Sequence, residues 1–418
     1  MPLIRSWVES ANSPETDFPL NNLALGVFTH PDTTGARCGV AIGDQILDAT
    51  GLEAAGLLNL SERPVLAEPA WNALMACGTQ AWADLRAQLT SMLSEDAPER
   101  LRIESFLHPM HAAKLHLPFT VAEYTDFYAS LHHATNVGTM FRGADNALPA
   151  NWLHIPVGYN GRASSVVVSG TDIRRPWGQL KTPDIPTPHF APSARFDFEL
   201  ELGAIVGQPS HGPITVAQAD EMIFGYVLLN DWSARDIQAW EYQPLGPFQS
   251  KATATTLSPW IVMRAALEPF RAPAPERVTP LLPHLSDCGP MHYDIELEVS
   301  LAPKGGQAVA ISRTNTRELY YSAAQQLAHH ASSGCPMRVG DLLGSGTISG
   351  PQAENRGSLL ELSWGGEAPI DIGGVSRSFL ENGDTLTLRG AAMADGYRIG
   401  FGPCSGRVLP ALKDPYVR

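Results

Sequence analysis

The chain has 418 residues, of which 44% are hydrophobic and 17% are charged, and its formal net charge is −14. This length exceeds one usual hydrophobic core, so the composition predicts two domains of an ordinary folded protein. The negative charge and the lack of any run of Lys and Arg exclude an extended nucleic-acid surface.

The cysteines and the hydropathy pattern indicate the compartment. The five cysteines are scattered, odd in number and without paired metal-ligand spacing, which predicts reduced thiols. The first 18 residues contain no continuous apolar segment, and no later stretch approaches the length of a membrane span. We therefore expect a cytoplasmic protein with neither a membrane nor a nucleic acid as partner.

Residues 1–118 are expected to form a small β-rich domain with a helical connection. The stretches "NLALGVFTH" and "CGVAIGDQILDA", the second with a Gly-Asp turn, predict strands, and "PAWNALMACG" and "AWADLRAQLTSML" predict amphipathic helices. This part of the chain carries no convincing group of reactive residues. In residues 119–418, short strands and Gly and Pro turns predict a β-dominated domain with inserted helices.

The segment "EYTDFYASLHHATNVGTMFRG", residues 123–143, concentrates reactive side chains near a predicted strand end. It carries Asp126, Tyr128, His132, His133 and Arg142. Each has a plain structural explanation, because tyrosines pack in cores and a single histidine is more often structural than catalytic. If the two histidines lie in a strand, they face opposite ways and only one of them serves a site.

The stretch "RFDFELELGAIVG", residues 195–207, predicts a strand with Asp197, Glu199 and Glu201 on one face. Taken alone, the pattern favours an acidic face in water, as is common in antiparallel sheets. The alternative is a row of carboxylates bound to a positive group. The opposite face is expected to pack in a core and carries Phe196, Phe198, Leu200 and Leu202.

The segment from residue 228 to residue 256 begins with an apolar strand end and continues in a helix-permissive pattern. Asp231, Arg235, Gln238 and Tyr242 share one helical face if the segment is helical from Asp231 onward. A carboxylate, a guanidinium, an amide and a phenol in a row suit recognition of an oxygen-rich anion. A solvated helix with an Asp–Arg pair is the alternative.

Four carboxylates from separate segments suit a hard divalent cation, either Ca²⁺ or Mg²⁺: Asp126, Glu199, Glu201 and Asp231. The lack of a convincing Cys/His cluster in the sequence speaks against zinc. The spacing is not that of an EF-hand, so the fold has to assemble such a site from distant segments.

Several long motifs in order resemble the fumarylacetoacetate hydrolase family, and the resemblance extends over nearly the whole chain. They are "YTDFYASLHHATNVGTMFRG", "RFDFELELG", "LNDWSARDIQAWEYQPLGPF", "GSGTISGP", "SLLELSW" and "GYRIGFGPCSGRVLPA". The resemblance implies a mainly β fold with some α structure, made of an N-terminal Src-homology-3-like small β-barrel (1–118) and a C-terminal mixed β-sandwich or roll (119–418). It also implies a homodimer.

The same resemblance implies an activity, which is hydrolysis of a carbon–carbon bond of the β-diketo acid 4-fumarylacetoacetate to fumarate and acetoacetate, the last step of tyrosine and phenylalanine catabolism. It makes His133 the general base that activates water and Glu361 the carboxylate that orients it. It assigns the oxyanion to Arg235, Gln238 and Lys251.

The resemblance further implies the ligand contacts. The four carboxylates hold Ca²⁺ or Mg²⁺, and a second cation lies near Asp231, Lys251 and Thr255. A charged lysine is a poor metal ligand, so we expect its side chain to serve the oxyanion and its backbone to serve that second ion. The residues that contact substrate oxygens or its terminal carboxylate are Tyr128, Arg142, Gln238, Tyr242 and Thr347.

Two positions depart from the family pattern, and two other functions compete with the main prediction. Ala254 stands where glycine is expected, and His132 stands where glutamine is expected. The rivals are a hydrolase or decarboxylase of the same superfamily that acts on acylpyruvates or related oxo-acids, and a non-catalytic carboxylate-binding protein. The joint presence of base, orienting carboxylate, oxyanion donors and cation ligands favours the hydrolase.

Overall fold

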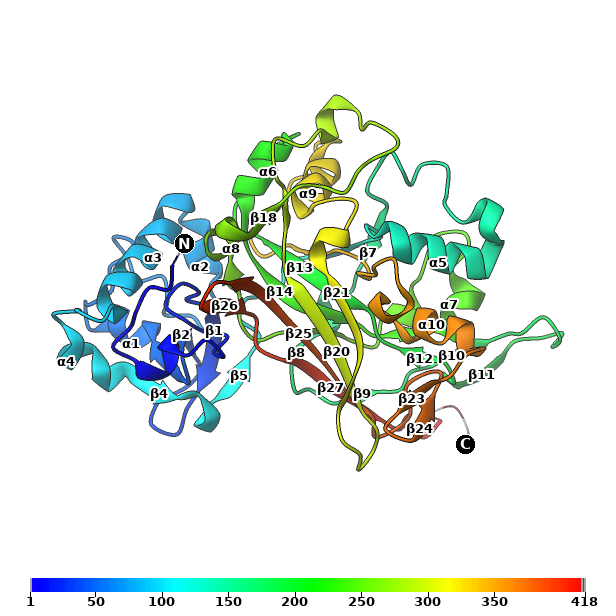
Figure 1. Cartoon of the computed structure of the whole chain (residues 1–418), viewed down its shortest axis with the longest axis horizontal. Coiled ribbons are helices and arrows are strands. Elements are labelled where there is room, and N and C mark those ends of the chain that lie inside the picture. The colour runs from blue at the N-terminus through cyan, green and yellow to red at the C-terminus, as the bar shows by residue number, and fades with distance from the viewer. Residues whose placement is uncertain (1, 415, 417–418) are drawn as a thin grey trace.

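The computed structural model describes residues 2–414 and 416 and shows a mainly β fold with some α structure (Figure 1). The N-terminal part of the chain forms a separate lobe beside a larger region built on two sheets. The mainly β class expected from the sequence is confirmed.

The N-terminal lobe contains one antiparallel sheet in the order β4-β3-β2-β1-β5. Its strands are β1 (Leu25–Thr29), β2 (Arg37–Ile42), β3 (Gln45–Asp48), β4 (Leu107–Pro109) and β5 (Lys114–His116). β2 and β3 meet at the predicted Gly-Asp turn, where Gly43 has a positive φ of 57° that glycine adopts without strain. Among the described residues β4 and β5 do not pair, so the sheet is a half-barrel rather than a closed barrel.

Four helices pack on this half-barrel, and they include the two amphipathic helices that the sequence predicts. They are α1 (Ala49–Ala54), α2 (Asn72–Ala76), α3 (Thr79–Leu93) and α4 (Arg100–Ile103). α3 buries Trp82, Leu85 and Leu89, which recur at helical spacing. The apolar core of this lobe continues into the larger region through Ile205 and Val227, and the domain division at residue 118 stays a prediction.

The first large sheet is mixed and carries the candidate site. Its strand order is β7-β6-β22-β13-β14-β16-β8, and β17 also pairs with β14. The strands are β6 (Tyr124–Phe127), β7 (Gly158–Asn160), β8 (Val166–Val168), β13 (Leu200–Val206), β14 (Ile223–Asp231), β16 (Thr255–Leu257), β17 (Val262–Met263) and β22 (Leu342–Gly344). β6 runs parallel to β22 and β8 runs parallel to β16, which makes this a curled mixed sheet.

The second large sheet packs face to face on the first. Its order is β21-β20-β25-β27-β9, with β26 on β25. The strands are β9 (Ile173–Arg174), β20 (Glu296–Ala302), β21 (Val309–Asn315), β25 (Thr385–Ala394), β26 (Tyr397–Gly400) and β27 (Cys404–Leu409). The sheets approach so closely that a Cβ atom on Gly390 of β25 would lie 2.9 Å from Leu228 of β14.

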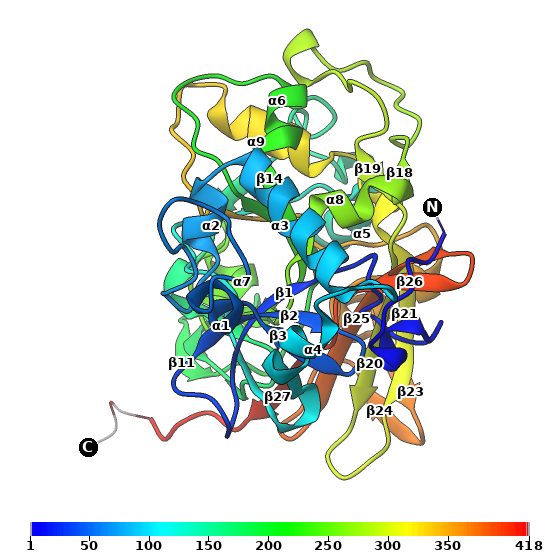
Figure 2. The ribbon, with the colours of Figure 1, turned by 90° about the vertical axis from the view of Figure 1, so that its left-hand side faces the viewer.

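Helices cover the ends of these sheets. α6 (Val216–Met222) and α9 (Ala323–Ala331) lie side by side at one end in both ribbon views (Figures 1 and 2), and each begins with a capping box. α5 (Leu131–Arg142), α7 (Arg235–Glu241) and α10 (Leu359–Leu362) lie at the opposite end. α8 (Arg264–Leu267) follows β17.

Four small two-stranded sheets complete the fold. They are formed by β10 (Trp177–Leu180) with β11 (His189–Pro192), β12 (Phe196–Asp197) with β15 (Ser233–Ala234), β18 (Arg271–Ala272) with β19 (His292–Tyr293), and β23 (Ile370–Ile372) with β24 (Val375–Arg377). The proline-rich segment before residue 195 forms the loop and the second strand of the β10–β11 hairpin, which projects from the body of the protein (Figure 1).

Four expectations from the sequence are wrong. The acidic strand is not continuous, because β12 pairs with β15 while β13 pairs with β14, and the chain changes partner at residues 198–199. Its acidic row does not face water, since Asp197, Glu199 and Glu201 are at most 5% exposed. The apolar row opposite is buried as expected.

The other two errors concern helix boundaries. α7 begins at Arg235, because Asp231 still pairs with Thr255 as the last residue of β14. His132 and His133 lie in the first turn of α5 rather than in a strand, because the Ser130 side chain caps that helix through the His133 N–H group.

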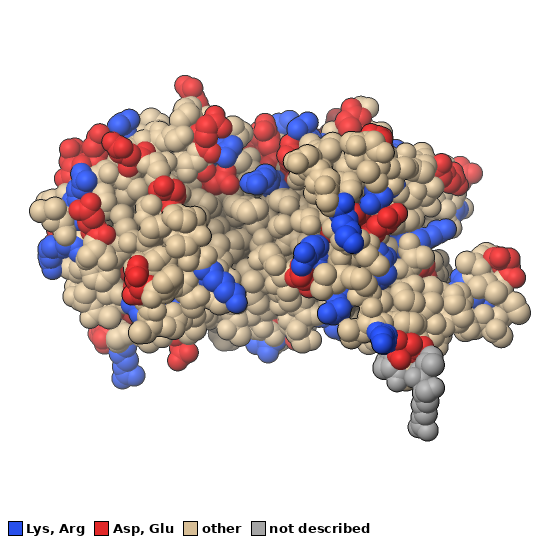
Figure 3. Space-filling view, turned by 90° about the horizontal axis from the view of Figure 1, so that it is seen from below, with Lys and Arg blue, Asp and Glu red and all other residues tan. Residues whose placement is uncertain are grey.

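Two further observations concern the helices and the surface. Within residues 2–414 and 416, no helix is both long and apolar enough to cross a membrane. On the face shown in Figure 3, Lys and Arg side chains are interspersed with Asp and Glu.

Candidate active site

Neighbouring strands of the first large sheet bring four carboxylates together at one end. Asp126 comes from β6, Glu201 from β13 and Asp231 from the end of β14, and Glu199 directly precedes β13. All four are buried, and one oxygen from each lies within 4.8 Å of the others. The fold therefore assembles the carboxylate cluster that the sequence predicts.

Gly344 of β22, which lies between β6 and β13, leaves open the space between Asp126 and Glu201. It pairs with Asp126 on one side and with Gly203 on the other. A Cβ atom at this position would lie 2.7 Å from Asp126 Oδ1 and 2.9 Å from Glu201 Oε2. Any side chain here would fill the space that the carboxylate oxygens surround.

Asp126 and Glu201 each use only one carboxylate oxygen in hydrogen bonds. Asp126 Oδ2 accepts from the Tyr159 hydroxyl at 2.7 Å, and Glu201 Oε2 accepts from the Gly346 N–H at 3.0 Å. The other oxygens, Asp126 Oδ1 and Glu201 Oε1, are buried and have no hydrogen-bond partner among the described residues. A buried carboxylate oxygen without a donor is costly, which indicates a missing positive group.

The charges around the cluster have opposite effects on its members. Burial first, and then the neighbouring carboxylates, raise the pKa of Asp126 and of Glu201. Burial also works to raise the pKa of Glu199, but Lys251 and Arg235 outweigh it and lower that pKa. Burial disfavours the charge on Lys251, yet Asp231 and Glu199 dominate and raise the pKa of its ammonium group.

These residues fit a hard divalent cation. The donor set is entirely oxygen, as Ca²⁺ and Mg²⁺ prefer. Lys251 contacts Glu199 and Asp231, the latter at 2.7 Å, and Thr255 Oγ1 donates to Asp231 at 3.2 Å. In the described part of the chain, neither Asp126 nor Glu201 has a cationic partner in an ion pair. A divalent cation would supply the missing positive charge.

A second buried group is the pair His133 and Glu361. His133 Nδ1 lies 2.6 Å from Glu361 Oε2, and both side chains are at most 4% exposed. The short distance and the burial fix the imidazole through Nδ1, which leaves Nε2 as the nitrogen that exchanges a proton. The Tyr128 ring packs edge-on against the imidazole at 5.4 Å.

Several donors surround Glu361 in addition to His133. Asn136, one helical turn beyond His133, donates its side-chain amide to Oε1 at 2.9 Å. Ser349 and Ser358 donate to Oε2 at 3.0 Å and 2.8 Å. Burial works to raise the pKa of Glu361, but His133 and these donors lower it. The carboxylate is therefore held in its charged form beside the imidazole.

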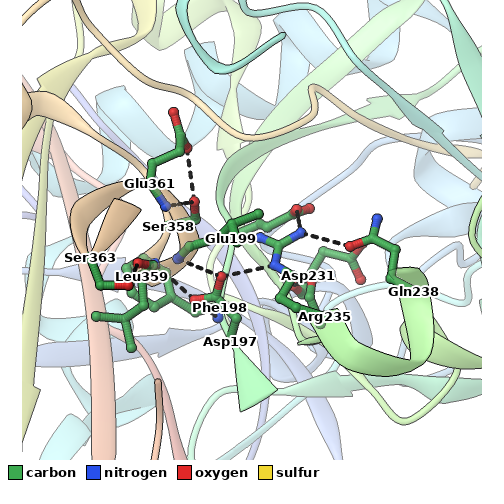
Figure 4. A network of polar contacts seen from close by, with 12 residues as sticks. Asp197, Phe198, Glu199, Asp231, Arg235, Gln238, Ser358, Leu359, Glu361 and Ser363 are labelled. Atoms are coloured by element: carbon green, nitrogen blue, oxygen red, sulfur yellow. Dashed lines mark hydrogen bonds and ion pairs between the residues drawn. The ribbon is translucent and has the colours of Figure 1, made fainter. Parts of the chain in front are cut away.

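Arg235 extends from the start of α7 to the same region. Its Nη1 donates to Glu199 Oε1 at 2.6 Å and to Gln238 Oε1 at 3.1 Å, and its Nε donates to Asp197 Oδ2 at 2.9 Å (Figure 4). Nη2 is buried and has no acceptor within the described residues. The guanidinium thus keeps one donor group for an anion.

A cavity of about 410 Å³ connects these groups. Nine of the residues predicted from the sequence line it: Tyr128, His133, Arg142, Glu199, Arg235, Gln238, Tyr242, Lys251 and Thr347. The Thr347 hydroxyl is buried without a partner among the described residues. Arg142 is positioned by the carbonyls of Asn146 and Ala147, which accept from its guanidinium at 3.1 Å and 2.6 Å.

The remaining predicted residues lie behind the cavity wall or outside the site. Glu361 does not line the cavity but contacts His133 Nδ1, and Asp126, Glu201, Asp231 and Thr255 lie on or at the ends of strands in the first large sheet. His132 lies away from the cavity, with its Nε2 3.6 Å from Glu318. Ala254 is buried in the main core.

Sequence reasoning missed Tyr159, which lines the cavity and contacts the cluster. It lies on β7 opposite Asp126 in the sheet register. The surrounding "VGYNGR" carries no periodic or charge signal, and a pairing between segments 33 residues apart cannot be read from one sequence. The same holds for Ser349, whose hydroxyl reaches Glu361 from a separate loop.

Together these features define a class of enzyme, in which a buried histidine–carboxylate pair and a carboxylate cluster suited to a divalent cation open on one substrate-sized cavity. Two family models match the chain. "Fumarylacetoacetate (FAA) hydrolase C-terminal" matches residues 123–409, and "Fumarylacetoacetase N-terminal" matches residues 21–118. The chain belongs to the fumarylacetoacetate hydrolase family.

Curated relatives are similar over nearly their whole length. Fumarylacetoacetase of Rattus norvegicus is 49% identical over 409 residues, which cover 95% of this chain and 97% of the rat protein. Fumarylacetoacetase of Arabidopsis thaliana is 45% identical over 422 residues, covering 98% and 100%.

A solved structure supports the fold alone. The fumarylacetoacetate hydrolase from psychrophilic Exiguobacterium antarcticum has a TM-score of 0.55 at 16% identity, and the match covers 93% of this chain and 99% of that one. The half-barrel and the curled mixed sheet are therefore fold features that this chain shares with that solved structure.

Proposed function

We propose that this protein is a fumarylacetoacetase, which hydrolyses 4-fumarylacetoacetate to fumarate and acetoacetate at the end of tyrosine and phenylalanine catabolism. The observation that supports this most directly is the His133–Glu361 pair at 2.6 Å, buried at the wall of a cavity that Arg235 and Lys251 also line. The full-length similarity to curated fumarylacetoacetases supports the choice of substrate.

Substrate binding is assigned to the polar side chains around the cavity. Arg142 and Tyr242 supply a cation and a phenol for carboxylate and keto oxygens, and Tyr128 supplies a further hydroxyl. Thr347 carries a buried hydroxyl without a partner among the described residues, which suits a contact to a substrate oxygen. These donors orient the β-diketo acid so that one carbonyl carbon faces His133.

His133 acts as the general base in this proposal. The neutral imidazole takes a proton from water at Nε2 while Glu361 holds Nδ1–H and stabilises the imidazolium. The water oxygen bonds to the carbonyl carbon, the adjacent carbon–carbon bond breaks, and acetoacetate leaves as an enolate. His133 returns the proton to the enolate carbon that was bonded to the attacked carbonyl carbon, so the atoms and charges balance.

The oxyanion formed by this attack is assigned to Arg235, Gln238 and Lys251. Arg235 Nη2 has no acceptor among the described residues, so it is free to donate. Gln238 accepts from Arg235 through Oε1, which leaves its N–H group as the donor toward the cavity. Fixed donors in a buried site stabilise a developing charge more than water does.

Asp126, Glu199, Glu201 and Asp231 would hold a divalent cation, either Ca²⁺ or Mg²⁺. When bound, this ion supplies Lewis-acid stabilisation of negative charge on the diketone oxygens. We propose a second cation near Asp231 and Thr255. Because the Lys251 ammonium already contacts Glu199 and Asp231, only its backbone would serve that ion.

The rival substrates are acylpyruvates and related oxo-acids. A maleylpyruvate hydrolase from a Sphingobium strain has a TM-score of 0.51 at 16% identity, so the fold alone fits both chemistries. The test follows the ultraviolet absorbance of fumarylacetoacetate with chelator-treated protein, before and after Ca²⁺ or Mg²⁺ is restored. We expect cation-dependent loss of the diketone signal with equal amounts of fumarate and acetoacetate. Turnover of an acylpyruvate, but not of fumarylacetoacetate, would overturn the proposal.

We also propose a homodimer in a reducing, cytoplasmic compartment. Apolar side chains are exposed around α7 and the β10–β11 hairpin, including Phe190, Trp240, Leu245 and Phe248, and such a surface suits a partner subunit. All five cysteines are free thiols, which suits a reducing environment. Light scattering on the purified protein tests the dimer, and a monomeric mass would contradict it.

A further inference from the structure

One buried carboxylate lies between the two halves of the candidate site and has no role in the proposed chemistry. Asp197 is 0% exposed and lines neither the cavity nor the cation cluster. Its Oδ2 accepts from Arg235 Nε at 2.9 Å. Its two oxygens also accept the backbone N–H groups of Leu359 and Leu360, at 2.8 Å and 3.0 Å.

These contacts join α7 to α10 (Figure 4). Arg235 is the first residue of α7, and Leu359 and Leu360 are the first two residues of α10. Glu361 follows immediately, and its side chain holds His133. On one side, Asp197 therefore holds the backbone of Leu360, the residue before Glu361 of the His133–Glu361 pair. On the other side, it directly contacts Arg235, the proposed oxyanion donor.

The carboxylate form suits this place. Asp197 Oδ1 also accepts the N–H of Phe198 at 2.8 Å, so four donors converge on two oxygens. An amide of the same size would direct its NH₂ group at one of these donors. A shift of about 1 Å in a supporting group costs about 10²-fold in rate when it displaces reacting groups.

We propose that Asp197 is a positioning residue that sets the placement of the Arg235 guanidinium relative to the Glu361–His133 pair. This role rests on the proposed function. Asp197 touches neither substrate nor reacting atoms. It acts through Arg235, whose orientation it fixes at Nε, and through the backbone that carries Glu361.

The simpler interpretation is that Asp197 only stabilises the fold. A second buried aspartate, Asp384, provides a matched control that separates this interpretation from the positioning role. Asp384 is also 0% exposed, pairs with Arg377 at 2.9 Å, and accepts the backbone N–H of Glu381 at 2.9 Å. It does not line the cavity. Asp197→Asn and Asp384→Asn thus remove the same kind of buried pair, and only the first touches the site.

The experiment compares kcat, KM and thermal unfolding of D197N and D384N in the full chain with the cation restored. We expect both variants to unfold at lower temperature, whereas kcat falls about 10²-fold in D197N and less than threefold in D384N, with KM little changed. If D197N does not fold, Asp197→Glu is used, because it keeps the charge and displaces the carboxylate. A kcat within threefold of D384N would overturn the proposal.

A second readout needs no turnover, so it separates this inference from the choice of substrate. In ¹⁵N-histidine-labelled protein, the ring proton between His133 and Glu361 is followed by NMR and assigned with His133→Asn. We expect this resonance to shift in D197N and to remain unchanged in D384N. Failure of the wild-type protein to hydrolyse fumarylacetoacetate would refute the proposed function only, whereas an unmoved resonance in D197N would refute the positioning role.

Discussion

Two sets of carboxylates in this site, Glu361 on one side and Asp126 with Glu201 on the other, are equally buried, but their pKa values are shifted in opposite directions. Glu361 receives hydrogen bonds from His133, Asn136 and two serines, and its pKa is lowered. Asp126 and Glu201 each keep one oxygen without a donor among the described residues, and their pKa values are raised. Burial alone does not decide the charge of a carboxylate, because the charges and hydrogen-bond donors around it also shift its pKa.

The difference indicates which part of the site is complete. All the donors to Glu361 belong to this chain, so the His133–Glu361 pair is preorganised without any added group. In the described part of the chain, Asp126 and Glu201 of the carboxylate cluster have no cationic partner, and the space left by Gly344 lies beside the unpaired Oδ1 of Asp126. We infer that activation of water depends on Glu361 and His133, and that binding of the cation depends on the carboxylate cluster.

The largest expected effect comes from a substitution in the His133–Glu361 pair. Glu361→Gln keeps the size of the side chain but removes the charge that orients and stabilises the His133 imidazole. We expect kcat to fall by about 10³-fold in this variant, which is within the range of general-base contributions. In His133→Ala, kcat should fall at least as far. Steady-state kinetics with restored cation measure this loss.

Cation binding serves as the control for these two variants. Calorimetric titration with Ca²⁺ is expected to give the same stoichiometry in E361Q, H133A and the wild type, because neither residue belongs to the cluster. Unchanged turnover in H133A would refute its role as base.

The second effect concerns stability in the absence of cation. In chelated protein, Asp126→Asn removes one of the carboxylates that repel one another, so the variant is expected to unfold at a higher temperature than the wild type. Added Ca²⁺ should stabilise only the wild type, by about 2.7 kcal/mol at a hundredfold excess over Kd. Calorimetric scans with chelator and with Ca²⁺ test both statements, and a destabilised D126N in chelator would contradict the repulsion.

The pH dependence should also differ between the two sets. Asp126 and Glu201 have raised pKa values, so the folded chelated protein binds protons that the unfolded chain has released. Its stability therefore rises as pH falls through these pKa values. Glu361 has a lowered pKa, and its contribution is lost only as pH falls through that value. Chelated wild-type protein should thus be most stable at mildly acidic pH, and D126N should show a flatter profile.

The sequence predicted these residue types well because strand periodicity and local motifs are short-range signals. The alternating pattern placed Glu199 and Glu201 on one face of a strand, and the resemblance of "LLELSW" to the family motif placed Glu361. The periodicity did not reveal that β12 and β13 pair with different strands, so it placed Asp197 on one strand face with Glu199 and Glu201, whereas Asp197 lies in a separate short sheet and pairs with Arg235.

Helix starts and cross-strand neighbours were harder to predict. The sequence is compatible with Asp231 either at the end of a strand or at the start of a helix. In the structure it pairs with Thr255 of β16 and is therefore the last residue of β14. Tyr159 and Gly344 reach the cluster only through the register of β6 with β7 and β22. Such pairings depend on contacts far apart in the chain, which one sequence does not contain.

A more selective change is Gly344→Ala. Its φ is not positive, so alanine is conformationally allowed, but the added methyl group would lie 2.7 Å from Asp126 Oδ1. We expect Ca²⁺ affinity to fall at least about tenfold, equivalent to about 1.4 kcal/mol, while the His133–Glu361 pair is unchanged. Calorimetric titration measures the affinity.

Gly203→Ala is the matched control for that variant. Gly203 pairs with Gly344 in the sheet, and the atoms nearest to an added Cβ there belong to the apolar side chains of Leu342, Val227 and Leu229. It should lower stability without changing cation affinity. Equal loss of affinity in both variants would mean that general sheet distortion, rather than filling of the space, is responsible.

The smallest effect is expected next to the base itself. His132 adjoins His133 in α5, but its side chain is 35% exposed and lies 3.6 Å from Glu318, outside the cavity. Such a partly exposed ion pair contributes about 0–1 kcal/mol. His132→Gln should therefore change kcat by less than about twofold and unfolding only slightly, whereas H133A abolishes turnover. A loss in H132Q comparable to that in H133A would mean that the exposed histidine exchanges the proton, and the assignment of the base to the buried pair would fail.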